Sequence, residues 1–177
     1  MSQTNNMEKD YKEISGISSK QKGNILEKRF IELASLGSNG MISCFTPDSD
    51  DDGIDAIINL KSAFKPLFIQ IKSRFKRNAN GTYSQDIGVN TFKANKNFYI
   101  CFFLYSIADF DIERIWLVPS IDFKKKAILL NPVDHPKKLR FAASPNDSSN
   151  DRWRKYRIEK KDLGKKLLGL LNEVPEP

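Results

Sequence analysis

The spacing of apolar residues predicts a helix near the start of the chain. Four apolar residues recur at helical spacing and form one stripe: Leu26, Phe30, Leu33 and Ala34. Ser18 and Gln21 have the spacing of a capping box, and Gly37 follows the last apolar position, so we expect the helix to run from near Ser18 to Gly37. The polar residues 1–16 before it are expected to form a flexible leader.

Short runs of apolar and β-branched residues predict strands through the middle of the chain. Strands are expected at residues 40–45, 54–60, 67–73, 98–107 and 113–120, with candidate edge strands at 138–144 and 153–159. Further helices are expected at residues 89–96, 121–127 and 160–174, and residues 74–86 are expected to form a basic loop. This order predicts an α/β sandwich with a mixed central β-sheet flanked by helices, folded as a single domain over residues 17–177.

Two polar side chains interrupt the apolar strand at residues 67–73. Gln70 and Lys72 are two residues apart, so they point to the same face of the strand, about 6.6 Å from one another. A hairpin with the preceding strand brings Asp55 beside them. Glu27 borders the apolar stripe of the first helix and is either exposed at its rim or directed into a site. An edge strand and a catalytic strand both explain this pattern.

Composition excludes several kinds of protein. A chain of 177 residues with 40% hydrophobic residues can build one sizeable core. The only cysteines, Cys44 and Cys101, lie among apolar residues, which argues against a disulfide framework or a cysteine zinc site. The single histidine, His135, argues against histidine-rich metal sites and most catalytic triads. The chain lacks a run of about 18 apolar residues, and its N-terminus lacks the apolar segment of a signal peptide, so a cytoplasmic location is expected.

The charge of the chain is unevenly distributed. Residues 1–60 carry six basic and ten acidic side chains, whereas residues 61–177 carry 23 basic and 12 acidic ones, for a net charge of +7. A polyanionic partner explains this asymmetry, and so does solubility. Five basic residues follow the Gln70 strand and are candidates for contacts with DNA phosphates: Arg74, Lys76, Arg77, Lys93 and Lys96.

Two further features have both a structural and a functional interpretation. The acidic run at residues 48–52 is either a solvated turn or a cation site, with Asp52 as a second metal-ligand candidate. Trp153 lies among arginines and either stacks on bases or fixes an edge strand to the core. We favour the core for Trp153.

Three segments of the sequence together resemble the PD-(D/E)xK nuclease superfamily. They are GNILEKRF, which carries Glu27, DDGIDAII, which carries Asp55, and FIQIKS, which carries Gln70 and Lys72. The Gln variant and the Gly-x-Asp approach are most similar to Mrr-like restriction endonucleases and archaeal Holliday junction resolvases. The resemblance covers residues 20–120. It implies a restriction-endonuclease-like fold and metal-dependent hydrolysis of DNA, with Glu27, Asp55, Gln70 and Lys72 as catalytic residues.

The resemblance also implies a cofactor and an assembly. Mg²⁺, with Mn²⁺ as a substitute, would be held by Asp55, the Gln70 amide oxygen, the Ile71 carbonyl and Glu27. Lys72 would stabilise charge on the phosphate and position or deprotonate the attacking water. A homodimer is expected because two DNA strands need two sites. DNA is the expected partner, and no membrane is.

Gln70 leaves alternatives open because an amide brings no negative charge to a metal site. A single metal ion is therefore favoured over two. The same departure is consistent with a nucleic-acid-binding module that has lost catalysis, or with a partner subunit of a restriction or defence complex. Within the nuclease class, the sequence does not separate restriction, homing and junction-cleaving activity.

Overall fold

The first helix forms where its apolar stripe and its cap predict. The computed structural model describes residues 16–48 and 53–175, so the expected leader, apart from Gly16, and Asp52 lie outside the described residues. Helix α2 spans Ser19–Gly37. The Gln21 backbone N–H donates to Oγ of Ser18 at 3.2 Å, and the Ser18 N–H donates to Oε1 of Gln21 at 2.8 Å, which completes the capping box. Three stripe residues are fully buried: Leu26, Phe30 and Ala34.

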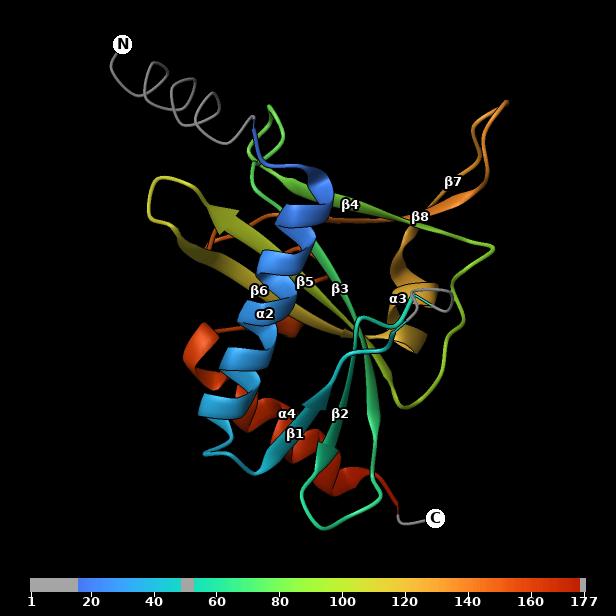
Figure 1. Cartoon of the computed structure of the whole chain (residues 1–177). Coiled ribbons are helices and arrows are strands. Elements are labelled where there is room, and N and C mark those ends of the chain that lie inside the picture. Colours follow the sequence, from blue (N-terminus) through green and yellow to red (C-terminus); the bar gives the residue numbers. More distant parts are fainter. Residues whose placement is uncertain (1–15, 49–52, 176–177) are drawn as a thin grey trace.

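A mixed six-stranded sheet forms the centre of the protein, and with its flanking helices it confirms the expected fold class (Figure 1). Its strands follow the order β1-β2-β3-β5-β6-β9, in which only the β3–β5 pair is parallel. The strands are β1 (Ile42–Phe45), β2 (Ala56–Leu60), β3 (Leu67–Arg74), β5 (Phe98–Ser106), β6 (Asp111–Pro119) and β9 (Arg157–Ile158).

The two faces of this sheet are covered differently. On one face, α2 and the C-terminal helix α4 (Leu163–Glu173) pack on alternate residues of the strands, including Ile69, Ile71 and Cys101. On the other face, Ile100 and Phe102 of β5 pack against a second sheet and the short helix α3 (Ser120–Lys126). Because side chains alternate along a strand, Gln70 and Lys72 point to the face of the second sheet.

The second sheet has the order β4-β8-β7 and was only partly predicted. β8 (Lys138–Ala143) confirms an expected strand, but β4 (Tyr83–Gly88) lies largely in the segment expected to be a loop, and β7 (Ile128–Leu130) was not expected. The sequence of β4 is polar except at Tyr83 and Ile87. These two side chains are buried because β8 supplies apolar partners such as Phe141.

The prediction of a helix over residues 89–96 is wrong. This segment forms turns, which are fixed by contacts with α3 rather than by helical hydrogen bonds. Oγ of Ser120 accepts from the Asn95 N–H at 2.9 Å and donates to the Asn95 carbonyl at 2.8 Å. Phe92 packs edge-on against Phe123, with 5.3 Å between ring centroids. Side chains therefore replace the backbone partners that a helix would supply.

The C-terminal part of the chain follows the prediction in outline. The expected edge strand at 153–159 is a 3₁₀ turn (Arg154–Tyr156) followed by the two residues of β9, and a second 3₁₀ turn (Lys160–Asp162) leads into α4. Trp153 is buried in the core, which confirms the interpretation favoured from the sequence. In the described ranges, no helix has the length and apolar character needed to cross a membrane.

Candidate active site

The carboxylate of Asp55 is held against β3 at the point where β2 begins. The Asp55 N–H donates to the Ile69 carbonyl at 2.9 Å, and Oδ2 of Asp55 accepts from the Ile71 N–H at 2.5 Å. These two hydrogen bonds lie on either side of Gln70 in the sequence. In an extended strand the N–H and C=O of one residue point to the same side, so the Ile71 carbonyl also points toward Asp55.

The side chain of Gln70 is buried, with 7% of its surface exposed. Its Oε1 has no hydrogen-bond partner within the described part of the chain. Leaving a buried acceptor unpaired costs about 1–3 kcal/mol. The backbone of Gly53 closes over the other end of the amide, because a Cβ at Gly53 would lie 2.6 Å from Nε2 of Gln70. The oxygen is thus buried beside Asp55 with an unused lone pair.

Lys72 lies two residues further along β3 and is half-buried on the same face as Gln70. Its backbone carbonyl accepts a hydrogen bond from the Tyr83 hydroxyl at 3.4 Å. Burial raises the pKa of Tyr83 well above its usual value, so this phenol stays neutral and remains a donor. The contact joins β3 to the first residue of the second sheet. Sequence reasoning missed Tyr83 because its segment was expected to be a loop.

Glu27 is positioned by α2, which covers the opposite face of β3 from Gln70 and Lys72. The N-terminal part of α2 lies beside the end of β3, since Nζ of Lys22 is 5.9 Å from the ring centroid of Phe75. Glu27 lies five residues further along the helix, about 7.5 Å along its axis. Glu27 is half-buried on a helix that packs against β3, on the other face of the strand from Gln70 and Lys72. To meet those side chains it would have to reach around the edge of β3 beyond Ile71, where β2 no longer pairs with it.

The predicted phosphate-binding residues fall into two groups. Arg74 donates to Oδ1 of Asn78 at 2.8 Å, and Arg77 forms an ion pair with Glu113, so both arginines hold the β3–β4 connection in place. The three lysines of the set are exposed: Lys76, Lys93 and Lys96. Lys93 and Lys96 lie in the turns after β4 and not on the helix expected for them.

The oxygen donors of this site fit a hard divalent cation. Ala56 pairs with Ile69, so Asp55 continues the register opposite Gln70, with the Ile71 carbonyl next along the strand. A carboxylate, an amide oxygen and a backbone carbonyl are oxygen ligands of the kinds that Mg²⁺ prefers. The described residues include no group of three or more His, Cys, Asp or Glu side chains suited to a metal. An amide oxygen and a backbone carbonyl carry no formal charge, so these three donors have less negative charge than three carboxylates would.

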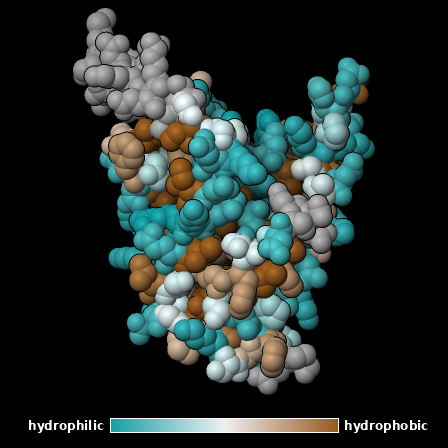
Figure 2. Space-filling model, in the orientation of Figure 1, coloured by the Kyte–Doolittle hydropathy of each residue, from teal (hydrophilic) through white to brown (hydrophobic). Residues whose placement is uncertain are grey.

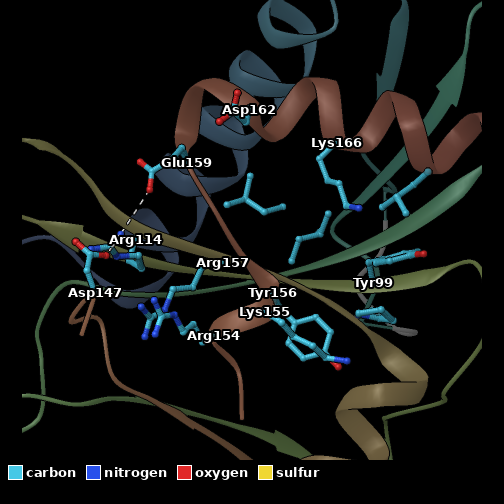
Figure 3. A pocket seen from close by; sticks show the side chains of 14 residues that line it. Tyr99, Arg114, Asp147, Arg154, Lys155, Tyr156, Arg157, Glu159, Asp162 and Lys166 are labelled. Atoms are coloured by element: carbon cyan, nitrogen blue, oxygen red, sulfur yellow. Dashed lines mark ion pairs between the residues drawn. The ribbon is translucent and has the colours of Figure 1, made fainter. Parts of the chain in front are cut away.

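A separate cavity lies between α4 and the β6–β9 edge of the sheet. It has a volume of about 750 Å³, and none of the predicted site residues lines it (Figure 3). In it Arg114 lies between two acids, 3.0 Å from Oδ1 of Asp147 and 3.6 Å from Oε1 of Glu159. Lys166 extends from α4 toward Tyr99 on the other side of the cavity. The charge of the half-buried Arg114 is thus balanced by acids at the rim of the cavity.

Comparison with known proteins adds one result. No protein-family model matches the chain, and no curated protein matches its sequence. Among solved structures, the bacterial homing endonuclease I-Ssp6803I matches with a TM-score of 0.54 and 17% sequence identity, over 88% of this chain and 93% of that one. The two chains share a fold over nearly their whole lengths.

Proposed function

We propose that this protein is a Mg²⁺-dependent DNA endonuclease of the PD-(D/E)xK type. The proposal rests on one observation: Asp55, Ile71 and the orphaned oxygen of Gln70 form a set of neighbouring oxygen donors on the β2–β3 pair. Lys72 follows Gln70 by two residues on the same strand. The shared fold with a homing endonuclease supports it. The excess of basic residues after position 60 is consistent with a DNA substrate.

The residues of the site have separate parts in phosphodiester hydrolysis. Asp55, Gln70 and the Ile71 carbonyl would hold the metal, and Glu27 would complete the set directly or through water. Bound Mg²⁺ supplies Lewis-acid stabilisation of the phosphate. The ammonium group of Lys72 lies on the same face as Gln70, where it would neutralise charge developing on the phosphate and orient the attacking water. In-line attack would leave a 5′-phosphate, as the superfamily resemblance implies.

DNA contacts and assembly extend the proposal. Lys76, Lys93 and Lys96 are exposed and would contact phosphates next to the scissile one. Arg74 and Arg77 would first have to exchange their partners within the protein. Within residues 16–48 and 53–175 we identify one such site, so a homodimer would supply the two sites needed to cut both strands.

A specific observation favours one alternative. Gln70 brings an uncharged amide to the site, so Asp55 is the one charged group among the three donors Asp55, Gln70 and Ile71. A nucleic-acid-binding module that has lost catalysis, or a subunit that acts with a catalytic partner, would be expected to retain the fold and the basic surface with a weak metal site.

The test compares the wild type with Asp55→Asn and Lys72→Ala on linear duplex, supercoiled plasmid and four-way junction DNA, with Mg²⁺ or Mn²⁺. Lys61→Ala is the matched control, because Lys61 is an exposed lysine in the turn between β2 and β3. We expect both site variants to lose about 10³-fold or more in cleavage rate, and Lys61→Ala to cleave like the wild type. Asn keeps an acceptor for the Ile71 N–H, so the fold should survive in Asp55→Asn.

Two results would count against the proposal. Cleavage of DNA by Lys72→Ala at the wild-type rate would refute the assignment of the active site to the β2–β3 pair. A wild-type protein that binds DNA but cuts none of the three substrates with either ion would favour the binding module. Titration with Mn²⁺ gives an independent measurement, in which Asp55→Asn should bind the ion more weakly than the wild type.

A further inference from the structure

The β7–β8 hairpin projects from the body of the protein as a narrow arm (Figure 1). Its strands pair antiparallel, with Ile128 opposite Arg140 and Leu130 opposite Lys138. The connecting residues 131–137 are all exposed. Figure 2 shows that the arm is mostly hydrophilic on the face it displays. β8 also pairs with β4 along its whole length, from Ala143 opposite Tyr83 to Lys138 opposite Gly88, so the part that projects beyond the second sheet is the connection at residues 131–137. We call the β7–β8 hairpin with this connection the ribbon.

The tip of this ribbon has the chemistry of a contact surface. Its sequence is NPVDHPK, in which Pro132 and Pro136 restrict the backbone. Val133 is 97% exposed, and Leu129 in the adjacent strand is 57% exposed. Exposed aliphatic side chains on a rigid ribbon gain nothing for the folded monomer. They become favourable when a partner covers them.

The base of the ribbon is strongly basic. Five lysines flank it in the sequence: Lys124, Lys125 and Lys126 at the end of α3, just before β7, and Lys137 and Lys138 where β8 begins. The Val89 N–H donates to the Lys137 carbonyl at 3.0 Å, which ties the end of β4 to the hairpin. Asp134 is the only acidic residue in the sequence from 128 to 143. Nearby, Asp86 accepts two hydrogen bonds from Arg140, at 2.7 and 2.8 Å.

We propose that the β7–β8 ribbon enters a groove of duplex DNA and reads sequence to one side of the cleaved bond. This inference rests on the proposed function and extends it to specificity. The projecting connection at residues 131–137 is two chain segments wide, and the major groove admits a two-stranded β-ribbon. Lysines at its base would hold the phosphates, while Asn131, His135 and the apolar Val133 at the tip would meet base edges and thymine methyl groups.

The fold gives the distance between this ribbon and the candidate active site. β4 begins at Tyr83, which contacts the Lys72 carbonyl, and ends at Gly88, which pairs with Lys138 at the base of the ribbon. The five residue-to-residue steps from Tyr83 to Gly88 span about 17 Å. Successive base pairs are about 3.4 Å apart along DNA, so the ribbon should meet bases about five or more pairs from the scissile phosphate.

The test measures DNA binding without metal, so that cleavage plays no part. Lys137→Ala/Lys138→Ala is compared with Lys161→Ala/Lys165→Ala, a control pair of exposed lysines before and in α4. Fluorescence anisotropy with a random-sequence 30-base-pair duplex in EDTA should show about tenfold weaker binding for the ribbon variant. A plot of the logarithm of the association constant against the logarithm of the salt concentration has a negative slope. In the ribbon variant this slope should become shallower by about 2. Unchanged affinity and slope in the ribbon variant would overturn the proposal.

A second variant tests the tip. Replacing residues 131–137 with Asn-Gly closes the hairpin as a short turn, and unchanged thermal unfolding would show that the body is intact. Selection of bound duplexes from a random pool should give a sequence preference for the wild type that flattens in the trimmed protein. An equal sequence preference in the wild type and the trimmed protein would show that the tip of the ribbon does not read DNA sequence.

The same two proteins separate this inference from the proposed function. A wild type that selects sequences through the ribbon but cuts no DNA would refute the nuclease alone, whereas a trimmed protein that cuts with wild-type selectivity would refute the ribbon alone. Sedimentation of Val133→Lys gives a further check. Conversion of a dimer to a monomer with unchanged DNA binding would show that the tip contacts a second copy, which overturns the proposal.

Discussion

Gly53 and the side-chain amide of Gln70 are so close that no side chain fits between them. A Cβ at Gly53 would lie 2.6 Å from Nε2 of Gln70, and the backbone of Gly53 has a positive φ of 65°. Glycine adopts this conformation without strain and has no atom to displace the amide. The segment that leads into Asp55 therefore passes directly against the side chain of Gln70.

We expect Gly53→Ala to damage the site more than it damages the fold. The matched control is Gly40→Ala, because Gly40 also has a positive φ of 75° but nothing within 4 Å of an added Cβ. Both variants should lose about 1–2 kcal/mol of stability from the strained backbone. Only Gly53→Ala should also displace Gln70 and reduce cleavage and Mn²⁺ affinity, by about tenfold or more. Equal activity of the two variants at equal stability would contradict this prediction.

Replacing Gln70 with leucine should separate stability from activity. Leucine has a similar volume and leaves no unpaired oxygen in the buried site, so the free energy of unfolding should rise by about 1 kcal/mol, as measured by urea denaturation. Cleavage and metal binding should be lost, because an apolar side chain has no ligand atom. Gln70→Glu is the companion variant and should bind Mn²⁺ more tightly than the wild type. A marked loss of stability in Gln70→Leu would mean that the oxygen has a partner in solution.

The contact between α2 and α4 gives a prediction about stability alone. A Cβ at Gly164 in α4 would lie 2.5 Å from the carbonyl carbon of Gly37 at the end of α2, so the two helices touch backbone to backbone. Gly164→Ala should cost about 1–3 kcal/mol through overpacking. In the same helix, Gly169→Ala meets nothing within 4 Å and should stabilise the protein by up to about 1 kcal/mol. Thermal unfolding should move in opposite directions for the two variants.

The Asp86–Arg140 pair predicts a pH dependence of stability. The hydrogen bonds from Arg140 lower the pKa of Asp86 below its usual value. The contribution of Asp86 to the stability of the fold is therefore complete above about pH 4, the pKa of an Asp side chain in the unfolded protein. It is lost as the pH falls through the lower pKa that Asp86 has in the folded protein. The pair is partly exposed, so Asp86→Asn should cost about 1 kcal/mol or less at pH 7.

The difference between wild type and Asp86→Asn should shrink toward zero when unfolding is repeated below pH 3. Asp134→Asn is the control, since Asp134 lies in the exposed hairpin loop, and it should have little effect at either pH. A difference that stays constant between pH 7 and pH 3 would show that the ion pair does not account for the role of Asp86.

Local patterns predicted the elements that carry the candidate site. The alternation around Asp55 and Gln70 predicted two strands, and a short turn made their antiparallel pairing the simplest arrangement. Ser18, Gln21 and the apolar stripe predicted α2. These features depend on residues close in the sequence, so the sequence alone displays them.

Features that depend on distant partners were not visible. β4 is a strand because Phe141 and its neighbours cover Tyr83, although polar residues dominate its own sequence. Arg77 pairs with Glu113, which lies on another strand, and no local pattern indicates that its charge is already balanced. The proximity of Gly53 to Gln70 likewise arises only when the β2–β3 pair has formed.

The packing between the two sheets also provides an optical signal. The only tryptophans of the chain, Trp116 and Trp153, are 0% and 1% exposed, and both belong to the cluster that joins the second sheet to the central one. Their intrinsic fluorescence should thus be blue-shifted in the native protein and should move to the red when the second sheet separates. Without any label, the emission maximum would report whether the base of the ribbon stays attached during DNA binding.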